Sequence, residues 1–542
     1  MGRLTKIEAK PEQSKHLETA TARVCDLSVD WVQQRGQEVY NPSSRIPTVA
    51  FGTPLEDAER RDLTINALFY NLRTRLIEDQ TGKGLSDLGL VPGHPKRIRT
   101  PLEPFQTFRD DPLRVVRAVR FAARFGREFE LDDEMVRAIE RDEIRRALLD
   151  PKKISRERVG AELDKMLLGR DPEYAFELIE RLKLHRLVFL YDHDSVFVAK
   201  EGMNMNQAPS RDELEGLVKP DLPDTVESVV AAKILTRLLA PASTTTTTTT
   251  TSGPEPSLPP LHPLLHLEVV RPQPLASGTS LTPYPEPTPV PVPSPTDFAP
   301  SSSPRRPASF LSEIFPHTLK RLYLSCGLLP LYDFSSVDKR KVVWVGEKVV
   351  RDGIKGPTVD VTWTKRARDG AKVVSDLVRA TMVDVDRNGP RTDEQDRVDI
   401  GMLLRNPSVH DGQHVRWNVT ILWTLVVELV RSRHDPAASV RIVQMYNRFV
   451  ERILELGLES KAFEPPLLDG KAINSLYPVT RSNPAMVQVL HLVTARQLAH
   501  PHATRQDLER WFLESEQARV VEDLCKATQA SLAGTKRKGG QK

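Results

Sequence analysis

Cysteine is scarce in this chain. Its 542 residues include only three cysteines, Cys25, Cys326 and Cys525. They lie far apart and form no Cys-x-x-Cys pair, so neither a disulfide framework nor a structural zinc site is indicated. This composition excludes a small disulfide-stapled protein and favours a reducing compartment.

A long apolar run and a large net charge are also missing. The nearest approach to a bilayer-spanning segment, residues 419–430, is interrupted by polar residues and by Glu428. The first residues have neither the apolar core of a signal peptide nor the composition of an arginine-rich transit sequence. The 77 Lys and Arg residues nearly balance the 73 Asp and Glu residues, which leaves a net charge of +4. We therefore expect no membrane association, and local charge clusters must identify any charged partner.

What the chain does have is length and a long low-complexity segment. With 39% hydrophobic residues it can bury more than one core, and about two to four domains are expected. Residues 244–307 begin with eight consecutive threonines and continue with Pro-rich and Ser-rich sequence. Such a composition cannot bury enough apolar surface to offset chain entropy. We expect this segment to be a disordered insertion without chemistry of its own.

Apolar spacing indicates an α+β fold. Alternation predicts a strand over residues 22–35, and residues 76–82 predict a short strand that leads into a loop. A helix that starts with acidic residues is predicted over 56–71. From residue 111 to about 190, and again after 310, the spacing is helical. A mixed α/β part is therefore followed by an all-α part.

Residues 108–125, FRDDPLRVVRAVRFAARF, predict an amphipathic helix whose polar face carries charge of one sign. At about 100° per residue, one sector of roughly 120° contains all four arginines. These are Arg114, Arg117, Arg120 and Arg124. Pro112 suits the first helical position, and Asp110 or Asp111 can cap the helix.

These arginines lack acidic partners on their own helix. Apart from the capping acids near Arg114, no Asp or Glu lies three or four residues from them inside the helix. One interpretation is a capped surface helix with solvated arginines. The other, which we favour here, is that an anionic group from elsewhere is their partner.

A second polar cluster occurs in RRDLTINA, residues 60–67. Asn66 follows Asp62 by four residues, so on a helix the two would share a face. A polar pair on a mostly buried helix commonly holds a neighbouring loop through hydrogen bonds. The pair alone therefore does not define a functional site.

Together, however, the motifs resemble the class II tRNA nucleotidyltransferases, the CCA-adding enzymes of the poly(A) polymerase family. The resemblance depends on the order and spacing of RRDxxINA at 60–67, the acidic pair and arginines at 110–117, and RERVGAELDKMLLG at 156–169. Residues 77–101 resemble the family's hinge between catalytic head and neck, and residues 14–35 resemble the fungal form of the preceding sheet segment.

The resemblance implies a domain order. It assigns residues 1–100 to the C-terminal part of the nucleotidyltransferase head, 101–200 to a helical neck with the nucleotide-selecting helix, 201–310 to a linker with the low-complexity insertion, 311–515 to a helical, tRNA-binding body and tail, and 516–542 to a basic C-terminal tail. It is strong over residues 14–192 and weaker in the helical C-terminal half, where residues 463–478 are similar to part of the body and tail.

The resemblance also implies how bases are selected. The family chooses CTP and ATP without a nucleic-acid template by pairing the base with an Asp and an Arg, which align with Asp111 and Arg114. A carboxylate only accepts hydrogen bonds, so it matches the amino groups of cytosine and adenine and repels the carbonyl oxygens of uracil and guanine. Arg117 and Arg120 would hold these two residues or meet phosphate.

Further residues follow from the same resemblance. Arg61, Asp62 and Asn66 belong to the family's RRD motif, and Arg61 and Asn66 are expected to contact the phosphate or sugar of the nucleotide. Asp110 stands where the family usually has Glu, which keeps the charge. Arg124 is interpreted as structural.

The metal-binding motifs of the family are not found. Nucleotidyl transfer needs two Mg²⁺ ions held by carboxylates, and the family supplies them from an Asp-x-Asp that follows a GGxxRD turn. The sequence contains one Gly-Gly, Gly539–Gly540. It contains Asp-x-Asp at Asp192/Asp194 and at Asp384/Asp386, neither after a glycine turn. These acids are interpreted as loop or helix-end residues.

Asp30 aligns where the superfamily often has a third active-site acid, and an exposed strand residue is an equally good interpretation. The metal site is therefore predicted as absent from this chain, although Mg²⁺ is expected for the family.

Three functions are consistent with the sequence. The favoured one is a CCA tRNA nucleotidyltransferase acting on tRNA, CTP and ATP, in a chain that lacks the N-terminal part of its head and by itself is expected to transfer little. The alternatives are a non-catalytic tRNA-binding or RNA-binding remnant of the family and a relative that adds only A. The resemblance suggests mitochondrion, cytoplasm and nucleus as locations, and the oligomeric state stays open.

Overall fold

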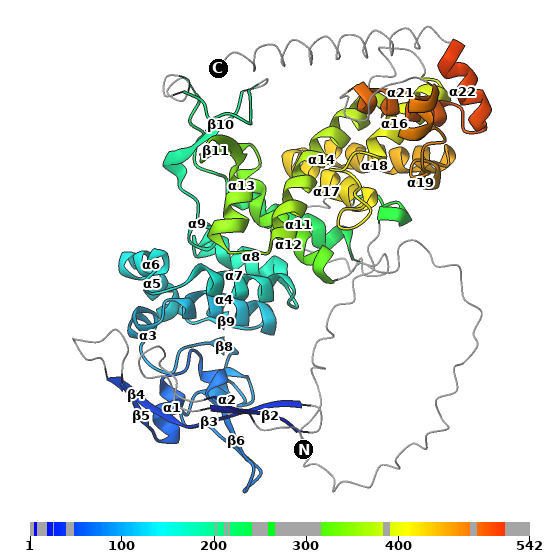
Figure 1. Ribbon diagram of the computed structural model, residues 1–542. Helices are drawn as coiled ribbons and strands as arrows, with labels where there is room; N and C mark the ends of the chain where they lie inside the picture. The colour runs from blue at the N-terminus through cyan, green and yellow to red at the C-terminus, as the bar shows by residue number, and fades with distance from the viewer. Residues whose placement is uncertain are drawn as a thin grey trace, which may run out of the picture. The chain divides into compact units, whose positions relative to one another are not determined.

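The computed structural model describes residues 5–7, 19–24, 27–39, 48–200, 203–210, 213, 217–240, 258–265, 316–382, 391–476 and 485–514. Most of the low-complexity segment, Asp384 and Asp386, and the basic tail lie outside these residues. The described residues form two compact units (Figure 1). The first holds residues up to 232 together with 316–358, and the second holds 233–265 and everything from 359 onward.

The N-terminal part of the first unit contains short strands. They are β1 (Thr5–Ile7), β2 (Thr19–Val24), β3 (Leu27–Val32), β4 (Arg35–Val39), β5 (Thr48–Phe51), β6 (Phe69–Asn71), β7 (Leu76–Glu78), β8 (Arg97–Ile98) and β9 (Glu130–Leu131). Strands β1, β2 and β3 form an antiparallel sheet, β4 pairs with β5, β6 pairs with β7, and β8 pairs in parallel with β9. The strand predicted at 76–82 is confirmed as β7. The single strand predicted at 22–35 is wrong, because this region contains two antiparallel strands, β2 and β3, whose pairing continues to Val24 and Leu27.

The helices that follow in the first unit are mostly short. They are α1 (Pro54–Glu59), α2 (Gly84–Asp87), α3 (Pro104–Asp110), α4 (Leu113–Phe125), α5 (Asp133–Glu140), α6 (Asp142–Leu149), α7 (Arg156–Leu167), α8 (Pro172–Arg181), α9 (His185–Phe189), α12 (Pro316–Leu328) and α13 (Val345–Lys348). Helix α4 packs against α7 and α8 (Figure 1). The helix α11 (Val226–Leu238) contains the boundary between the units.

The single helix predicted over residues 56–71 is wrong. Helix α1 ends at Glu59, a 3₁₀ turn η1 covers Thr64–Asn66, and β6 follows. The Asp62 carboxylate accepts a hydrogen bond from the Leu63 backbone N–H at 3.0 Å, and Leu63 is extended. A side chain that bonds to nearby backbone competes with the helical ladder, and this ends the helix.

The arginine helix is confirmed as α4, with its start shifted by one residue. Pro112 is the N-cap and not the first helical residue. Neither Asp110 nor Asp111 is the N-cap, but the Asp111 carboxylate, one residue before the cap, accepts from the Leu113 N–H at 3.2 Å. The helix ends before Gly126, whose φ of +107° is one that other residues rarely adopt. The predicted apolar face is buried, namely Val115, Val116, Val119, Ala122 and Ala123.

The fold class is α+β, but the helical part also contains strands. β10 (Val196–Val198), β11 (Phe334–Asp338) and β12 (Lys341–Trp344) form a three-stranded antiparallel sheet. Each of these strands has three to five residues, so their period-two alternation is too short to distinguish from helical spacing. The stretch after β12 includes a π-helical turn, Val349–Gly353.

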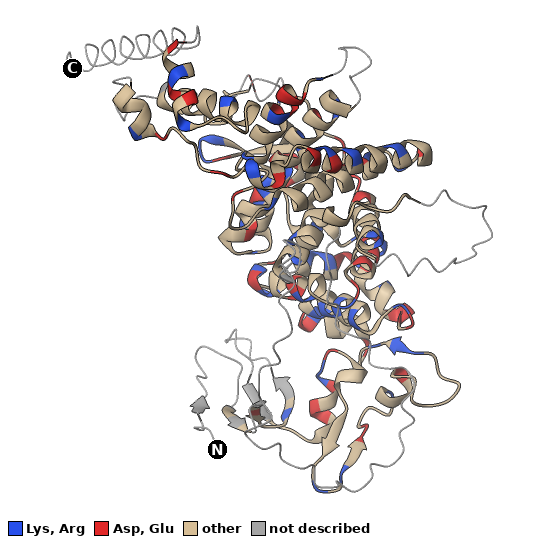
Figure 2. Ribbon diagram, turned by 90° about the vertical axis from the view of Figure 1, so that its right-hand side faces the viewer, with Lys and Arg blue, Asp and Glu red and all other residues tan. Residues whose placement is uncertain are grey.

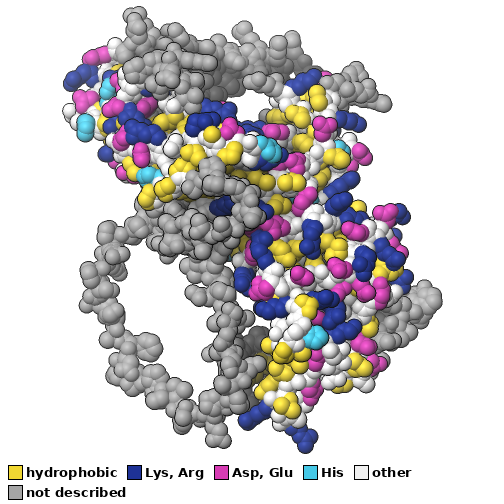
Figure 3. All heavy atoms as spheres, turned by 180° about the vertical axis from the view of Figure 1, so that it is seen from behind, with side chains coloured by type: hydrophobic (Ala, Val, Ile, Leu, Met, Phe, Trp, Pro, Cys, Tyr) yellow, Lys and Arg dark blue, Asp and Glu magenta, His cyan; other side chains and the backbone are white. Residues whose placement is uncertain are grey.

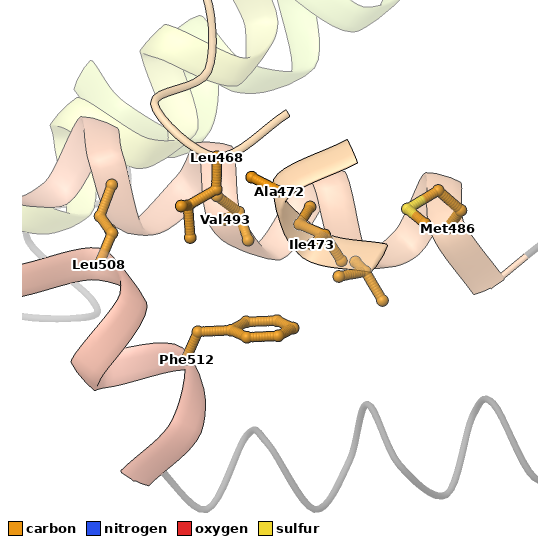
Figure 4. Close-up of a cluster of buried hydrophobic side chains, with 8 residues drawn as sticks. Leu468, Ala472, Ile473, Met486, Val493, Leu508 and Phe512 are labelled. Carbon is orange, nitrogen blue, oxygen red and sulfur yellow. The ribbon is translucent and has the colours of Figure 1, made fainter. Parts of the chain in front are cut away.

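The second unit is helical in its described residues. Its helices are α14 (Thr358–Met382), α16 (Asp393–Leu404), α17 (Trp417–Arg431), α18 (Pro436–Glu455), α19 (Leu458–Lys461), α20 (Gly470–Leu476), α21 (Ala485–Ala499) and α22 (Arg505–Glu514). Leu468, Ile473 and Phe512 belong to a buried cluster that joins α20, α21 and α22 (Figure 4). Residues 463–476 therefore contribute to a packed core.

Both signs of charge occur along the described helices. Lys and Arg are mixed with Asp and Glu in Figure 2, and on the face drawn in Figure 3 both signs are interspersed. No helix among the described residues is both long enough and apolar enough to cross a membrane. A charged partner is therefore expected at a local cluster of charge, as the small net charge also indicates.

Gly160 allows α7 to approach the segment after the π-helical turn. A Cβ atom at this position would lie 1.9 Å from the Ile354 carbonyl oxygen, far inside van der Waals contact.

We predict that Gly160→Ala destabilises the first unit by about 1–3 kcal/mol through overpacking. Denaturant unfolding measures this, with Ala161→Ser at the exposed neighbour as control; equal stability of Gly160→Ala and wild type would contradict the packing.

Candidate functional site

An open cleft of about 420 Å³ lies in the first unit, between the segment after α1, the start of α4 and α7. Nine residues line it: Arg60, Arg61, Asp62, Asn66, Asp111, Arg114, Arg117, Phe121 and Arg158. Five are arginines and two are aspartates, so the lining carries an excess of positive charge. Such a lining favours an anionic ligand.

Asp57 fixes the two arginines at one side of the cleft. Its buried carboxylate pairs with Arg60 through one oxygen and with Arg61 through the other, the latter at 2.8 Å. Arg61 also donates to the Asn66 carbonyl oxygen at 2.8 Å. Burial alone would raise the pKa of Asp57, but the hydrogen bonds from Arg61 and Arg60 outweigh it and lower the pKa. Both guanidiniums are thus held in place by the Asp57 carboxylate.

Asp62 connects the segment after α1 to the arginine helix. One of its oxygens accepts from the Leu63 N–H and from the Asn66 side-chain amide at 3.1 Å. The other accepts from Arg117 Nε at 2.7 Å. Asp62 and Asn66 therefore contact each other through a turn, and the prediction that they share one helical face is wrong.

Glu162 of α7 is the second buried carboxylate that holds α4. It pairs with Arg120, lies 3.7 Å from Arg117 and accepts from Lys165 at 2.8 Å. Burial alone would raise the pKa of Glu162, but the partners, with Lys165 the largest contributor, lower it. The anionic partners of Arg117 and Arg120 are thus carboxylates of the protein itself, supplied by other elements.

Asp111 and Arg114 lie at the junction of α3 and α4, and both line the cleft. Asp111 has one oxygen on the Leu113 N–H and the other on Arg158 at 3.1 Å. Arg114 donates to the carbonyl oxygen of Arg60. Both side chains are partly exposed, so a ligand in the cleft can reach them.

Six of the predicted site residues come together in the cleft: Arg61, Asp62, Asn66, Asp111, Arg114 and Arg117. Three do not line it. Arg120 is buried against Glu162, Asp110 is exposed and accepts from Gln106 at 2.7 Å, and Asp30 is exposed on β3 and accepts from Thr21 at 2.8 Å. Arg124 is exposed and also lies outside the lining.

Sequence reasoning missed several residues of the site. Arg60, Phe121 and Arg158 line the cleft, and Asp57 and Glu162 hold its arginines. Arg117 and Arg120 lie over the Phe121 ring, with guanidinium carbons 5.7 Å and 3.9 Å from its centre. One signal was available, because Arg158 and Glu162 are four residues apart and so project from the same side of α7.

The described residues do not fit a magnesium site. They contain no group of three or more His, Cys, Asp or Glu side chains arranged to hold a metal ion. Both oxygens of Asp62 already accept hydrogen bonds within the protein. Asp192 accepts from the Asp194 N–H at 3.1 Å and caps a 3₁₀ turn, so it has the loop role expected from the sequence. No chemical step through a metal is assigned to these residues.

The comparisons with known proteins cover this same region. Residues 2–90 match the family described as Poly A polymerase head domain, and residues 128–191 match the probable RNA and SrmB-binding site of polymerase A. These two regions thus match models of one class of protein, the poly(A) polymerase family of nucleotidyltransferases.

Within that class, the region is similar to fungal CCA tRNA nucleotidyltransferases. The mitochondrial enzyme of Candida glabrata is 45% identical over 202 residues, which cover 37% of this chain and 36% of that protein. The mitochondrial enzyme of Saccharomyces cerevisiae is 48% identical over 195 residues, 36% of this chain and 34% of that protein. The chain thus spans about a third of the length of these relatives. A solved CCA-adding enzyme in apo form I has a TM-score of 0.47 at 15% identity, over 95% of this chain and 81% of the other.

The Asp57 carboxylate allows a test by pH. We predict that Asp57→Asn lowers the free energy of unfolding by about 1–3 kcal/mol at neutral pH, because Arg60 and Arg61 lose a charged acceptor. A lowered folded-state pKa contributes stability above the ordinary value of 3.8 and loses it as pH falls through the folded-state value. The difference between variant and wild type should therefore shrink in acid.

Unfolding curves at pH 7 and at decreasing pH below the ordinary value of 3.8, with Glu59→Gln on the same helix as control, measure this difference. A gap that stays constant across that range would contradict the ionic role of Asp57.

We predict that a change at Glu162 lowers the free energy of unfolding more than a change at Asp57 does. Glu162→Gln removes the charge that compensates buried Arg120, and breaking one side of a buried pair costs about 3 kcal/mol. We expect the double variant Arg120→Met/Glu162→Leu to be more stable than Glu162→Gln, since it leaves no unpaired buried charge. Chemical unfolding of the three proteins measures the order, and a double variant less stable than the single one would refute it.

Proposed function

We propose that this chain is part of a CCA tRNA nucleotidyltransferase, which adds C, C and A to the 3′ end of tRNA from CTP and ATP. The single observation that carries the proposal is the cleft in which Asp111 and Arg114 face the same space as Arg61 and Arg117. The similarity of this region to the fungal CCA tRNA nucleotidyltransferases supports it.

The base would be read by Asp111 and Arg114. The free acceptor positions of Asp111 take the exocyclic amino group of cytosine or adenine, and Arg114 donates to the neighbouring ring nitrogen or carbonyl oxygen. Uracil and guanine present a carbonyl oxygen to the carboxylate, and the unsatisfied contact costs about 1–3 kcal/mol. To reach the base, Arg114 exchanges its contact with the Arg60 carbonyl for one with the nucleotide.

The triphosphate and sugar would be held by the segment after α1. Arg60 and Arg61 are pre-oriented by Asp57, and a fixed guanidinium binds phosphate oxygens with less loss of rotamer freedom than a mobile one. Asn66, held by Asp62 at 3.1 Å, is suited to a sugar hydroxyl. Arg117 and Arg120 keep α4 against Asp62 and Glu162, and Asp110 and Arg124 remain outside the ligand.

The remaining assignments follow the relatives. We propose tRNA as the second substrate, bound by the helical part through its phosphates with a strong dependence on salt. Magnesium is expected for this class of enzyme and would supply charge neutralisation at the triphosphate. The described residues do not offer a set of ligands for it, and Asp30 remains a proposed third carboxylate. The designation of two relatives supports a mitochondrial location, and cytoplasm and nucleus are further proposed locations.

Selective nucleotide binding tests the proposal. We predict that the purified chain binds CTP and ATP at least about tenfold more tightly than UTP and GTP, and that Asp111→Ala removes most of this preference. Isothermal titration calorimetry with each nucleotide measures it, and Arg124→Gln, outside the cleft, is the control. Equal affinity of wild type for all four nucleotides would refute the base-reading role.

Transfer is measured separately, with tRNA that lacks CCA, labelled nucleotides and Mg²⁺. Ordered incorporation of C, C and A would establish the reaction. Incorporation of A alone would favour the A-adding relative, and selective binding without incorporation would favour the tRNA-binding alternative.

A further inference from the structure

Asp111 can select a base only if its carboxylate is held in one orientation. An aspartate rotates about two side-chain bonds, and a freely rotating carboxylate could turn another oxygen or its edge to a wrong base. In the described structure both oxygens are anchored, one by the Leu113 N–H at 3.2 Å and the other by Arg158 at 3.1 Å. The backbone contact alone leaves rotation about that one anchor, so the second anchor determines the plane of the carboxylate.

We propose that Arg158 is a positioning residue for base selection, which acts by orienting Asp111. This inference rests on the proposed nucleotide-binding function of the cleft and adds a residue and a role to it. Arg158 comes from α7, 47 residues beyond Asp111, and both side chains line the cleft. With Arg158 bonded to one oxygen, the outward lone pairs of Asp111 face the space that the base would occupy.

The platform that carries Arg158 is rigid. Arg156 is the first residue of α7 and precedes Arg158 by two positions. Its guanidinium donates to the carbonyl oxygens of Leu187, Val188 and Gly353. Gly160 lies against the Ile354 carbonyl. The first turn of α7 is therefore fixed on the side away from the cleft, and an orienting group works best when its own support cannot move.

Stability alone does not explain the Arg158–Asp111 pair. The two side chains are 50% and 31% exposed, and ion pairs at such exposure contribute little to folding. The pairs that hold the fold here are the buried ones at Asp57 and Glu162, with carboxylates only 5% exposed. Arg158 could instead contact a phosphate directly. Because phosphate is common to all nucleotides, loss of such a contact would weaken the binding of all four nucleotides equally.

The test compares CTP with UTP and ATP with GTP by calorimetry on the full chain. We expect Arg158→Gln to reduce the CTP/UTP and ATP/GTP affinity ratios roughly tenfold, the loss of one oriented charged hydrogen bond. Arg158→Lys should restore most of the ratio, since an ammonium also donates to Asp111. Arg146→Gln on α6, where the side chain is 82% exposed, is the matched control and should leave the ratios unchanged.

A double variant separates positioning from direct contact. If Arg158 acts through Asp111, adding Arg158→Gln to Asp111→Ala changes the ratios no further. An additional loss in the double variant, or equal weakening of CTP and UTP by Arg158→Gln alone, would overturn the positioning role. Wild type that binds all four nucleotides alike would overturn the base-reading function itself, so the two failures are distinguishable.

Discussion

The cost of burying a carboxylate without a cationic partner shapes this site. Asp57, Asp62 and Glu162 are each almost fully buried. Asp57 is paired with arginines three and four residues further along the chain, whereas Asp62 and Glu162 are paired with arginines of α4. Because these last two buried acids need their arginines, the segment after α1, helix α4 and helix α7 are drawn into one arrangement. The cleft is the space that remains between these paired elements.

The same pairing separates arginines by role. Arg120 pairs with Glu162 and does not line the cleft, whereas Arg60, Arg61, Arg114 and Arg117 do. A guanidinium has five N–H donors in a planar fork, so one arginine can hold a protein carboxylate and still face a ligand. The excess of positive charge in the lining therefore coexists with a well-paired interior.

Several parts of this arrangement were predictable from local pattern. The burial of the apolar face of residues 113–125 and the aspartate that bonds the first helical N–H follow from spacing over a few residues. The helix predicted over 56–71 failed because the Asp62 side chain competes with the backbone ladder. Spacing alone does not reveal such competition. The strands β10 to β12 were not predicted because they are too short for their alternation to be recognised.

The sequence by itself determined that a one-sided row of arginines exists and that its partners lie outside its own helix. Only the tertiary structure decided that Asp62 and Glu162 are those partners for Arg117 and Arg120, and that Arg158 holds Asp111. Helical periodicity is a local property that can be counted along the chain. Which distant carboxylate meets which guanidinium depends on how α4 packs against α7 and the segment after α1, and that packing is set by burial across many residues at once.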